Sequence, residues 1–511
     1  MGSTDQTTQP LAGIDKVAVI GAGISGITSA AHLLRQGLQV TVFERSSQTG
    51  GVWHYDDRVA NEPAYPNSQA PAPNPENLGN WPHGVQSSKL KTFEEASIEH
   101  APPGPCYQGL RNNVPTTLMR STLMNWPEGT PEIVSQDLID QYLRGLALHT
   151  GVQDHIVFDT NVDNISKDSG LGRWIVNTRT LRKTGPDFEF LGRKWEFDAV
   201  IVASGHYHEP KIPDIPGLKE WKERYPENIS HSKRYRSPEK FRDKTVFVIG
   251  AGVSSLDVVR ESNTVAKKVY QSARDGQFDI PASLLPEDVD RVGGIEKFVL
   301  RDGQASGEVF LKDGRVLTDI DAVVLGTGYI TSYPFLGPLQ DPTVSTEEAD
   351  DKIIVSKDGL TTHNLHKDIF YIPDPTLVFV GVPYYTSTFS LFDFQAEVVS
   401  RFLAGKAALP KQEVLRAEYD ERKAGLVEGS KTFHSLMRKE VPYMNGILEW
   451  INAEAKRLGF EPMRGVDERW LERYNFFMAE MTKKREGDSG EEKFTPAIPP
   501  GLRLVVGPAS A

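Results

Sequence analysis

Cysteine is nearly absent from this sequence of 511 residues, in which Cys106 is the only one. A lone thiol cannot form an internal disulfide, perform dithiol redox chemistry or supply a pair of metal ligands. His206 and His208 form a suggestive histidine pair, but no carboxylate stands at metal-ligand spacing from them. We therefore expect no disulfide, no metal site and a reducing intracellular environment.

Positive charge is also scarce, because 57 lysine and arginine residues face 69 aspartate and glutamate residues, for a formal net charge of −12. This balance opposes broad attraction to nucleic acid or to an anionic membrane, so any phosphate must be recognised locally. No run approaches the roughly 18 apolar residues of a membrane span. The polar start MGSTDQTTQPLAG has no apolar signal core. We expect a cytoplasmic protein without a nucleic-acid or membrane partner, and a homodimer stays open.

The sequence instead repeats one plan, in which an apolar strand, a glycine turn, a helix and a second strand follow each other. The copies are KVAVIGAGISGITSAAHLLRQGLQVTVFE and KTVFVIGAGVSSLDVVRESNTVAKKVYQSAR. This plan predicts an α/β fold with two Rossmann-like dinucleotide-binding domains, the smaller inserted into the larger. The larger domain is expected over 13–212 and 332–485, where it ends in a helical region, and the smaller over 213–331. Residues 486–511 are expected to form a loosely held tail.

Proline is concentrated between Asn61 and Pro82, where the sequence contains EPAYPNSQAPAPNPENLGNWP. This composition does not support a regular strand ladder. We expect an ordered insert or lid there, with a passive surface loop as the alternative.

The first glycine turn carries the spacing of a dinucleotide site. Gly21 permits the tight turn, Gly23 admits a pyrophosphate close to the backbone, and Gly26 allows the helix to pack on the strand. The N–H groups at the helix N-terminus then favour a diphosphate. Glu44 ends the second strand, where a carboxylate accepts hydrogen bonds from ribose hydroxyls and repels a 2′-phosphate. The pattern predicts FAD or NAD rather than NADP.

A second pair of glycines follows Glu44 and completes an ExxxxxGG arrangement, in the sequence Gly50, Gly51, Val52 and Trp53. Together with the GxGxxG turn, it resembles the FAD site of flavoproteins that bind two dinucleotides. The resemblance implies FAD as the cofactor of the first domain, with Gly51 and Trp53 among its binding residues.

The second turn is formed by small residues: Gly250, Gly252, Ser254 and Ser255. Ser255 replaces the third glycine and is small enough for the helix contact. The following strand ends at Arg274 without an acid at the ribose-reading place. A guanidinium there can pair with a 2′-phosphate, and Ser272 can donate a further hydrogen bond. The pattern predicts NADPH as the second cofactor, with an ordinary surface charge as the alternative for Arg274.

One FAD site and one NADPH site in the same chain imply hydride transfer from nicotinamide to flavin, after which the electrons need an acceptor. Cys106 alone cannot form the cysteine pair of a disulfide reductase. An amine oxidase needs no second dinucleotide site. Molecular oxygen therefore remains the expected acceptor.

The segment ahead of the second glycine turn resembles a fingerprint of the class B flavin-containing monooxygenases. Residues 225–235 read YPENISHSKRY, close to the family's FxGxxxHxxxY. His231 and Tyr235 fall on the fingerprint positions. The phenylalanine and glycine of the fingerprint are Tyr225 and Glu227 here.

Two further segments are similar to the same family, and the resemblance covers about residues 17–409. LGTGY contains its TGY element, which places Thr327 among the cofactor-binding residues. CYQGLRNNVPTTLM matches a segment whose functional asparagine falls on Asn113, with a turn-capping role as the alternative. Gln395, in FDFQAEVV, is expected at a helix start facing the flavin, as in comparable helices of the family.

The resemblance implies an FAD- and NADPH-dependent monooxygenase. In such enzymes reduced flavin and oxygen form a 4a-hydroperoxide, bound NADP⁺ shields it, and a nucleophilic nitrogen or sulfur of a small molecule accepts oxygen. Asn113 is expected to steady the peroxide as an uncharged donor and acceptor. Tyr235 stands where Baeyer–Villiger relatives carry tryptophan, which favours heteroatom oxygenation of an amine or alkaloid-like secondary metabolite. Baeyer–Villiger oxygenation of a ketone, or a flavin-binding protein without turnover, are the alternatives.

Overall fold

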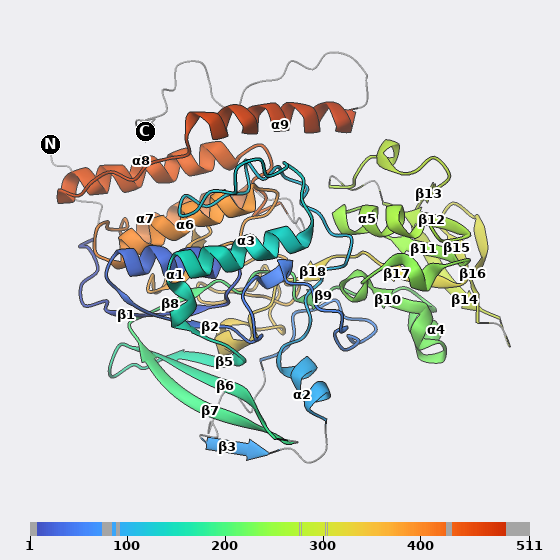
Figure 1. The fold of residues 1–511 in the computed structure, drawn as a ribbon, viewed down its shortest axis with the longest axis horizontal. Helices are drawn as coiled ribbons and strands as arrows, with labels where there is room; N and C mark the ends of the chain where they lie inside the picture. Colours follow the sequence, from blue (N-terminus) through green and yellow to red (C-terminus); the bar gives the residue numbers. More distant parts are fainter. Residues whose placement is uncertain are drawn as a thin grey trace.

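The computed structural model describes residues 8–486 except 74–83, 88–91, 186, 275, 277, 302, 304 and 426–431. The described chain forms two units side by side, each built on its own sheet (Figure 1). The prediction of an α/β fold with two Rossmann-like units and a helical C-terminal region is confirmed. The domain boundaries stay predictions, and residues 487–511 of the predicted tail lie outside the described residues.

The first unit contains a seven-stranded sheet in the order β19-β20-β21-β8-β1-β2-β4. Its strands are β1 (Lys16–Ile20), β2 (Gln39–Phe43), β4 (Ile156–Val157), β8 (Ala199–Val202), β19 (Leu365–His366), β20 (Phe370–Tyr371) and β21 (Leu377–Phe379). β1 runs parallel to β2 and β8, and β8 runs parallel to β21. The carboxyl ends of these four strands therefore meet at one edge of the sheet.

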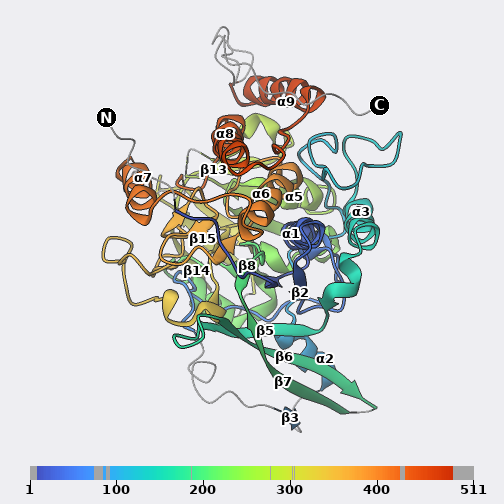
Figure 2. The ribbon, with the colours of Figure 1, turned by 90° about the vertical axis from the view of Figure 1, so that its left-hand side faces the viewer.

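The alternation of side chains along β1 explains the two layers that cover this sheet. Val17 and Val19 pack against helices, whereas Ala18 and Ile20 pack against an antiparallel sheet. The helices are α1 (Ile24–Arg35), α3 (Gln136–His149), α6 (Thr388–Leu403) and α8 (Glu440–Leu458). The antiparallel strands are β3 (Gly84–Ser87), β5 (Thr160–Lys167), β6 (Trp174–Thr184) and β7 (Asp187–Phe197). Figures 1 and 2 show the helices above the sheet and the antiparallel strands below it.

The second unit contains a parallel five-stranded sheet in the order β10-β17-β11-β12-β13. Its strands are β10 (Ile229–His231), β11 (Thr245–Ile249), β12 (Lys268–Ser272), β13 (Asp290–Val292) and β17 (Ala322–Leu325). Helix α5 (Val253–Ser262) contributes Val258 and Val259 to the apolar cluster on one face. The other face is covered by α4 (Leu218–Arg224) and by the antiparallel strands β14 (Ile295–Leu300), β15 (Gly307–Leu311) and β16 (Val316–Ile320).

The chain crosses between the units through two short strands that pair with each other, β9 (Glu209–Pro210) and β18 (Tyr329–Ile330). The proline-rich stretch lies against this junction in its described part, 61–73. Asn67 forms an isolated β-bridge with Ile212. The Glu62 carboxylate forms an ion pair with the Lys222 ammonium of α4, with 2.9 Å between oxygen and nitrogen. These described residues therefore form an ordered strap on the second unit, and residues 74–82 lie outside the description.

The outer helices are α2 (Phe93–His100), α7 (Gln412–Ala424) and α9 (Glu468–Glu486). α9 lies over α8 in Figure 1, and its Trp470 donates a hydrogen bond to Ser390 of α6 at 3.1 Å. Across the described ranges, no helix has the length and apolar composition needed to cross a bilayer. The same ranges hold no cluster of three histidine, cysteine or acidic side chains arranged to bind a metal.

Candidate active site

The first glycine turn has no room for side chains. Gly21 has a φ of +103°, in the region that favours glycine, and a Cβ on Gly26 would lie 1.8 Å from the Gly21 carbonyl oxygen. A Cβ on Gly51 would lie 2.9 Å from the Cα of Gly23, so the two glycine motifs are in contact. No side chain caps α1 at Gly23, which leaves the first N–H groups of the helix to a ligand. The turn fits a dinucleotide diphosphate.

Glu44 lies beside this turn and is buried. Its Oε2 accepts a hydrogen bond from the Ala22 N–H at 2.8 Å, and its Oε1 accepts from the Ser46 N–H at 2.9 Å. The carboxylate is thus held at the carboxyl end of β2, where the sequence predicts a ribose contact. Trp53 follows the second glycine pair, and its ring packs edge-on against that of Phe389 with 6.5 Å between the ring centres.

The second glycine turn repeats the first with one change. Gly250 has a φ of +106°, and a Cβ there would lie 2.4 Å from the Gly326 carbonyl oxygen. Ser255 is fully buried and donates a hydrogen bond to the same oxygen at 3.3 Å, so it fills the position of the third glycine without breaking the turn. Gly252 and Ser254 are exposed at the start of α5, where no side chain caps the helix.

Ser272 lies beside the second turn with its hydroxyl already bonded, and its cofactor contact stays a prediction. Its hydroxyl is buried and donates to the Gly293 carbonyl oxygen at 2.8 Å, so its one proton is already committed to the neighbouring segment. Arg274 is exposed just beyond β12. Of the two residues predicted to bind a 2′-phosphate, only Arg274 keeps a donor group free for it in this geometry.

The structure adds Lys211, which sequence reasoning missed. Burial and the charge of Arg274 lower the pKa of Lys211, while Asp358 opposes this shift. Its backbone is held by the turn after β17, since Lys211 N–H donates to the Gly328 carbonyl oxygen at 2.9 Å and the Thr327 hydroxyl donates to the Lys211 carbonyl. Thr327 therefore positions the linker, and Lys211 feels the charge of Arg274.

Asn113 is exposed, and its neighbour Asn112 performs the capping role that the sequence left open for Asn113. The buried Asn112 amide donates to the carbonyl oxygens of Val114 and Glu132, both at 2.7 Å, and accepts from the Val134 N–H at 2.6 Å. These bonds fix the loop and leave the Asn113 side chain on its surface.

Gln395 lies elsewhere in its helix than the sequence predicts. Helix α6 begins at Thr388, so Gln395 lies in the middle of the helix rather than at its start. The side chain is fully buried, with its Oε1 accepting from the Gly381 N–H at 3.0 Å and its Nε2 donating to the Tyr443 hydroxyl at 2.7 Å. Its amide holds the segment after β21 in place, and its position facing the flavin stays a prediction.

Two tyrosines bond to α5 beside the second turn, and one of them, Tyr107, comes from the first unit. Tyr107 donates a hydrogen bond to Asp257, and Tyr235 donates to Glu261, each at 2.5 Å. Their rings meet at 5.4 Å, and both acids stand one turn apart on α5. Burial raises the pKa of both carboxyls.

His231, the other fingerprint residue, is fully buried with its pKa lowered to about 4 by burial, and it donates to the Gly328 carbonyl oxygen at 3.0 Å. It is therefore neutral near pH 7 and ties the end of β10 to the turn after β17.

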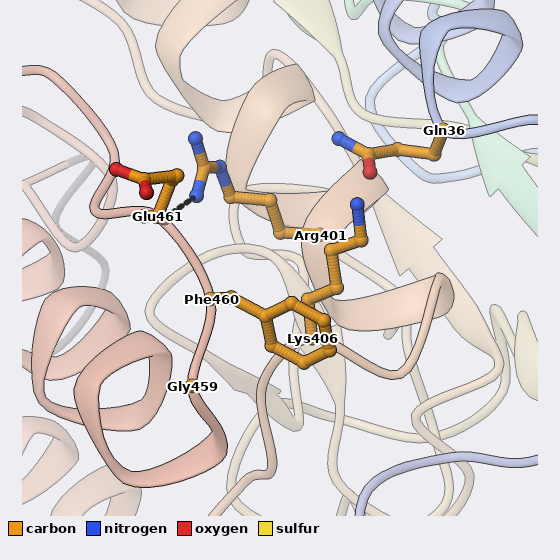
Figure 3. A pocket seen from close by; sticks show the side chains of 6 residues that line it. All are labelled: Gln36, Arg401, Lys406, Gly459, Phe460 and Glu461. Atoms are coloured by element: carbon orange, nitrogen blue, oxygen red, sulfur yellow. Dashed lines mark hydrogen bonds between the residues drawn. The ribbon is translucent and has the colours of Figure 1, made fainter.

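A separate small pocket of about 300 Å³ lies at the other end of α1 (Figure 3). It is lined by Gln36, Arg401, Lys406, Gly459, Phe460 and Glu461. Arg401 donates to the Glu461 carbonyl oxygen, and Lys406 lies over the Phe460 ring. Because α1 has 12 residues, about 18 Å separate this pocket from the glycine turn. It is therefore not part of the cofactor site.

Two glycine turns without a side-chain cap, the first beside the Glu44 carboxylate and the second followed by the exposed Arg274, define a flavoprotein that binds two dinucleotides. A family model described as flavin-binding monooxygenase-like matches residues 90–286 and 296–460, and a model for an NAD(P)-binding Rossmann-like domain matches residues 19–67. The chain belongs to the flavin-binding monooxygenase-like family.

Similar proteins agree with this assignment. The flavin-containing monooxygenase ustF2 of Aspergillus flavus is 39% identical over 89% of this chain and 96% of its own length. The solved S-allyl-L-cysteine S-oxygenase of Allium sativum has 25% identity and a TM-score of 0.66, covering 93% of this chain and 94% of its own. A cyclohexanone monooxygenase shares the fold, with 14% identity, a TM-score of 0.56 and 88% and 99% coverage. The protein is an NADPH-dependent flavin monooxygenase with FAD and NADPH as cofactors, which confirms those predictions.

Proposed function

We propose that the enzyme, acting in the cytoplasm, oxygenates the nitrogen of an amine or alkaloid-like secondary metabolite, with the sulfur of a thioether as the second substrate class. Both atoms carry a lone pair that can accept an electrophilic oxygen atom. The Allium sativum relative is named for oxygenating the sulfur of S-allyl-L-cysteine, and its likeness extends over 93% of this chain. That likeness supports heteroatom oxygenation.

Tyr235 is the observation that carries this proposal. Its side chain is 1% exposed, stacks on Phe241 at 6.2 Å and donates to Glu261. The tryptophan of Baeyer–Villiger relatives would need more volume in this packed site and would move the hydrogen-bond donor away from Glu261. The second unit is thus packed around a phenol at this position, in keeping with the heteroatom-oxygenating branch.

The proposed roles of the remaining residues follow from their positions. The turn at Gly21 and the carboxylate of Glu44 hold the FAD diphosphate and ribose, and the turn at Gly250 with Arg274 holds NADPH. Bound FAD, once reduced, supplies the chemistry of oxygen activation, and the protein orients the partners and excludes water. Asn113 offers an uncharged donor and acceptor from the surface of its loop.

A substrate panel tests the proposal. Amines, thioethers and ketones are compared by oxygen uptake and NADPH oxidation, and each product is identified by mass and retention. We expect amines to stimulate oxygen uptake and to yield products one oxygen atom heavier, with thioethers next. Stimulation by ketones alone, with ester or lactone products, would show that the enzyme is a Baeyer–Villiger oxygenase instead.

A further inference from the structure

Five aromatic side chains lie on segments that follow the strands of both sheets. Tyr207 follows β8, and Tyr384 and Tyr385 follow β21, in the first unit. Phe278 follows β12, and Tyr329 begins β18 just after β17, in the second unit. Ligands of such sheets bind outside the carboxyl ends of the strands. These five residues, named here the aromatic row, therefore lie on the ligand-binding side of both units.

The rings of the row touch one another in sequence. Tyr385 meets Tyr384 at 5.5 Å between ring centres, and Tyr207 meets Tyr329 at 5.5 Å. His206 connects these pairs, since its ring lies 4.3 Å from that of Tyr207 and 6.3 Å from that of Tyr384. The row is thus a continuous aromatic surface, and no member of it carries a charge.

Two contacts of the row span the two units, Tyr207 on Tyr329 and Phe278 on Tyr385. Phe278 stacks on Tyr385 with ring centres 4.8 Å apart and an angle of 15° between the ring planes. Tyr385 has a φ of +58°, which is unfavourable for an aromatic residue. Tyr385 and Tyr207 are 41% and 48% exposed. Large rings held open to solvent in this way mark a binding surface rather than a core.

Two hydroxyl groups beside these rings lack a hydrogen-bond partner among the described residues. The Oη of Tyr384 and the Oγ1 of Thr386 are both buried without one, and Thr386 is 8% exposed as a whole. Burial raises the pKa of Tyr384, so its hydroxyl stays protonated and can donate. A buried polar group without a partner is costly unless a ligand or water satisfies it.

We propose that the aromatic row binds an aryl group of the substrate. Phe278 and Tyr385 now stack on each other, and the aryl ring of the substrate would replace one of these two rings in the stack. A polar group of the substrate next to its aryl ring would then bond to the Tyr384 or Thr386 hydroxyl. The substrate class is then an aryl-bearing amine or thioether with a hydrogen-bonding substituent. This inference rests on the proposed function, because it names the substrate of the same site.

Matched substrates test the inference. N,N-dimethylbenzylamine is compared with N,N-dimethyl(cyclohexylmethyl)amine, and thioanisole with cyclohexyl methyl sulfide, by kcat/KM and product yield. Each pair presents the same nucleophilic atom, but only the aryl member can stack. We expect the wild-type enzyme to favour the aryl members by roughly 2- to 12-fold, the worth of one aromatic contact. Equal efficiency within both pairs would overturn the inference and leave the proposed function intact.

Variants locate the preference. Phe278→Ala is expected to abolish it and Tyr385→Phe to preserve it. Phe460→Ala, which changes a 40% exposed ring in the pocket of Figure 3, is the control expected to leave it unchanged. Tyr385→Leu replaces Phe278→Ala if that variant does not fold. NADP⁺ affinity of the same variants is measured by fluorescence titration. If Phe278→Ala loses as much NADP⁺ affinity as aryl preference, the row belongs to the nicotinamide site and the inference is overturned.

Failure of the proposed function has a different signature. If only ketones are oxygenated, that function is wrong, and phenylacetone against cyclohexylacetone then measures the aryl preference. A preference for phenylacetone that Phe278→Ala removes would uphold the inference. Equal turnover of the two ketones would overturn it.

Discussion

Replacing Arg274 with alanine should raise the KM for NADPH about tenfold and leave the use of NADH nearly unchanged. Arg274 is exposed just after β12, where the adenosine end of a dinucleotide lies in a fold of this type. A guanidinium there contacts the 2′-phosphate, which NADPH has and NADH lacks. The effect should therefore depend on the cofactor.

The magnitude follows from the surroundings of Arg274. A hydrogen bond to a charged group contributes about 1.5–3 kcal/mol, or about 10- to 150-fold in binding. Water screens an exposed guanidinium, which favours the lower end of that range. Lys211 is near enough for the charge of Arg274 to lower its pKa, so its ammonium retains part of the attraction. Removing both charges, in Arg274→Ala with Lys211→Met, should raise the effect to about 100-fold.

The assay compares kcat/KM for NADPH and NADH from the loss of the reduced-nicotinamide absorbance. Arg260→Ala removes another exposed arginine of the second unit, on α5, and should leave the ratio unchanged. Ser272→Ala should also leave it unchanged, because that hydroxyl donates to Gly293. An equal loss with both cofactors, or no loss at all, would refute the assignment of Arg274.

Three further predictions concern other parts of the chain. Gly26→Ala should yield protein without FAD, because its Cβ would lie 1.8 Å from the Gly21 carbonyl oxygen; flavin absorbance measures this, and a fully yellow variant would contradict it. Burial raises the pKa of Glu440 from 4.5 to about 7, so its stabilising contribution is complete below pH 4.5 and is lost as the pH rises to about 7. Glu440→Gln should remove this pH dependence, which amounts to about 3 kcal/mol in the free energy of unfolding. If the melting temperatures of wild type and variant change with pH in the same way, the prediction is wrong. Tyr107→Phe should destabilise the protein by about 1 kcal/mol, since the half-buried Asp257 carboxylate loses its donor; an unchanged denaturation midpoint would argue against it.

The parts of the site that could be predicted from the sequence are those whose geometry is local. Gly21, Gly26 and Glu44 lie within one strand, turn, helix and strand, so their spacing already determines the shape of the turn and the place of the acid. The same holds for the second turn, where Ser255 substitutes for glycine. Family membership followed from such segments and is confirmed.

Tertiary structure alone decided which side chains remain free. Gln395 and Ser272 suit a ligand by residue type, yet Tyr443 and Gly293 occupy their polar groups. Lys211 could not be recognised as a neighbour of Arg274, because the two are brought together only when the linker pairs with the turn after β17. A hydrogen bond or a charge acts over a few ångströms in space, and distance along the chain does not measure that separation. Sequence therefore determined the two nucleotide turns of this protein, and the fold determined which neighbouring groups can still serve them.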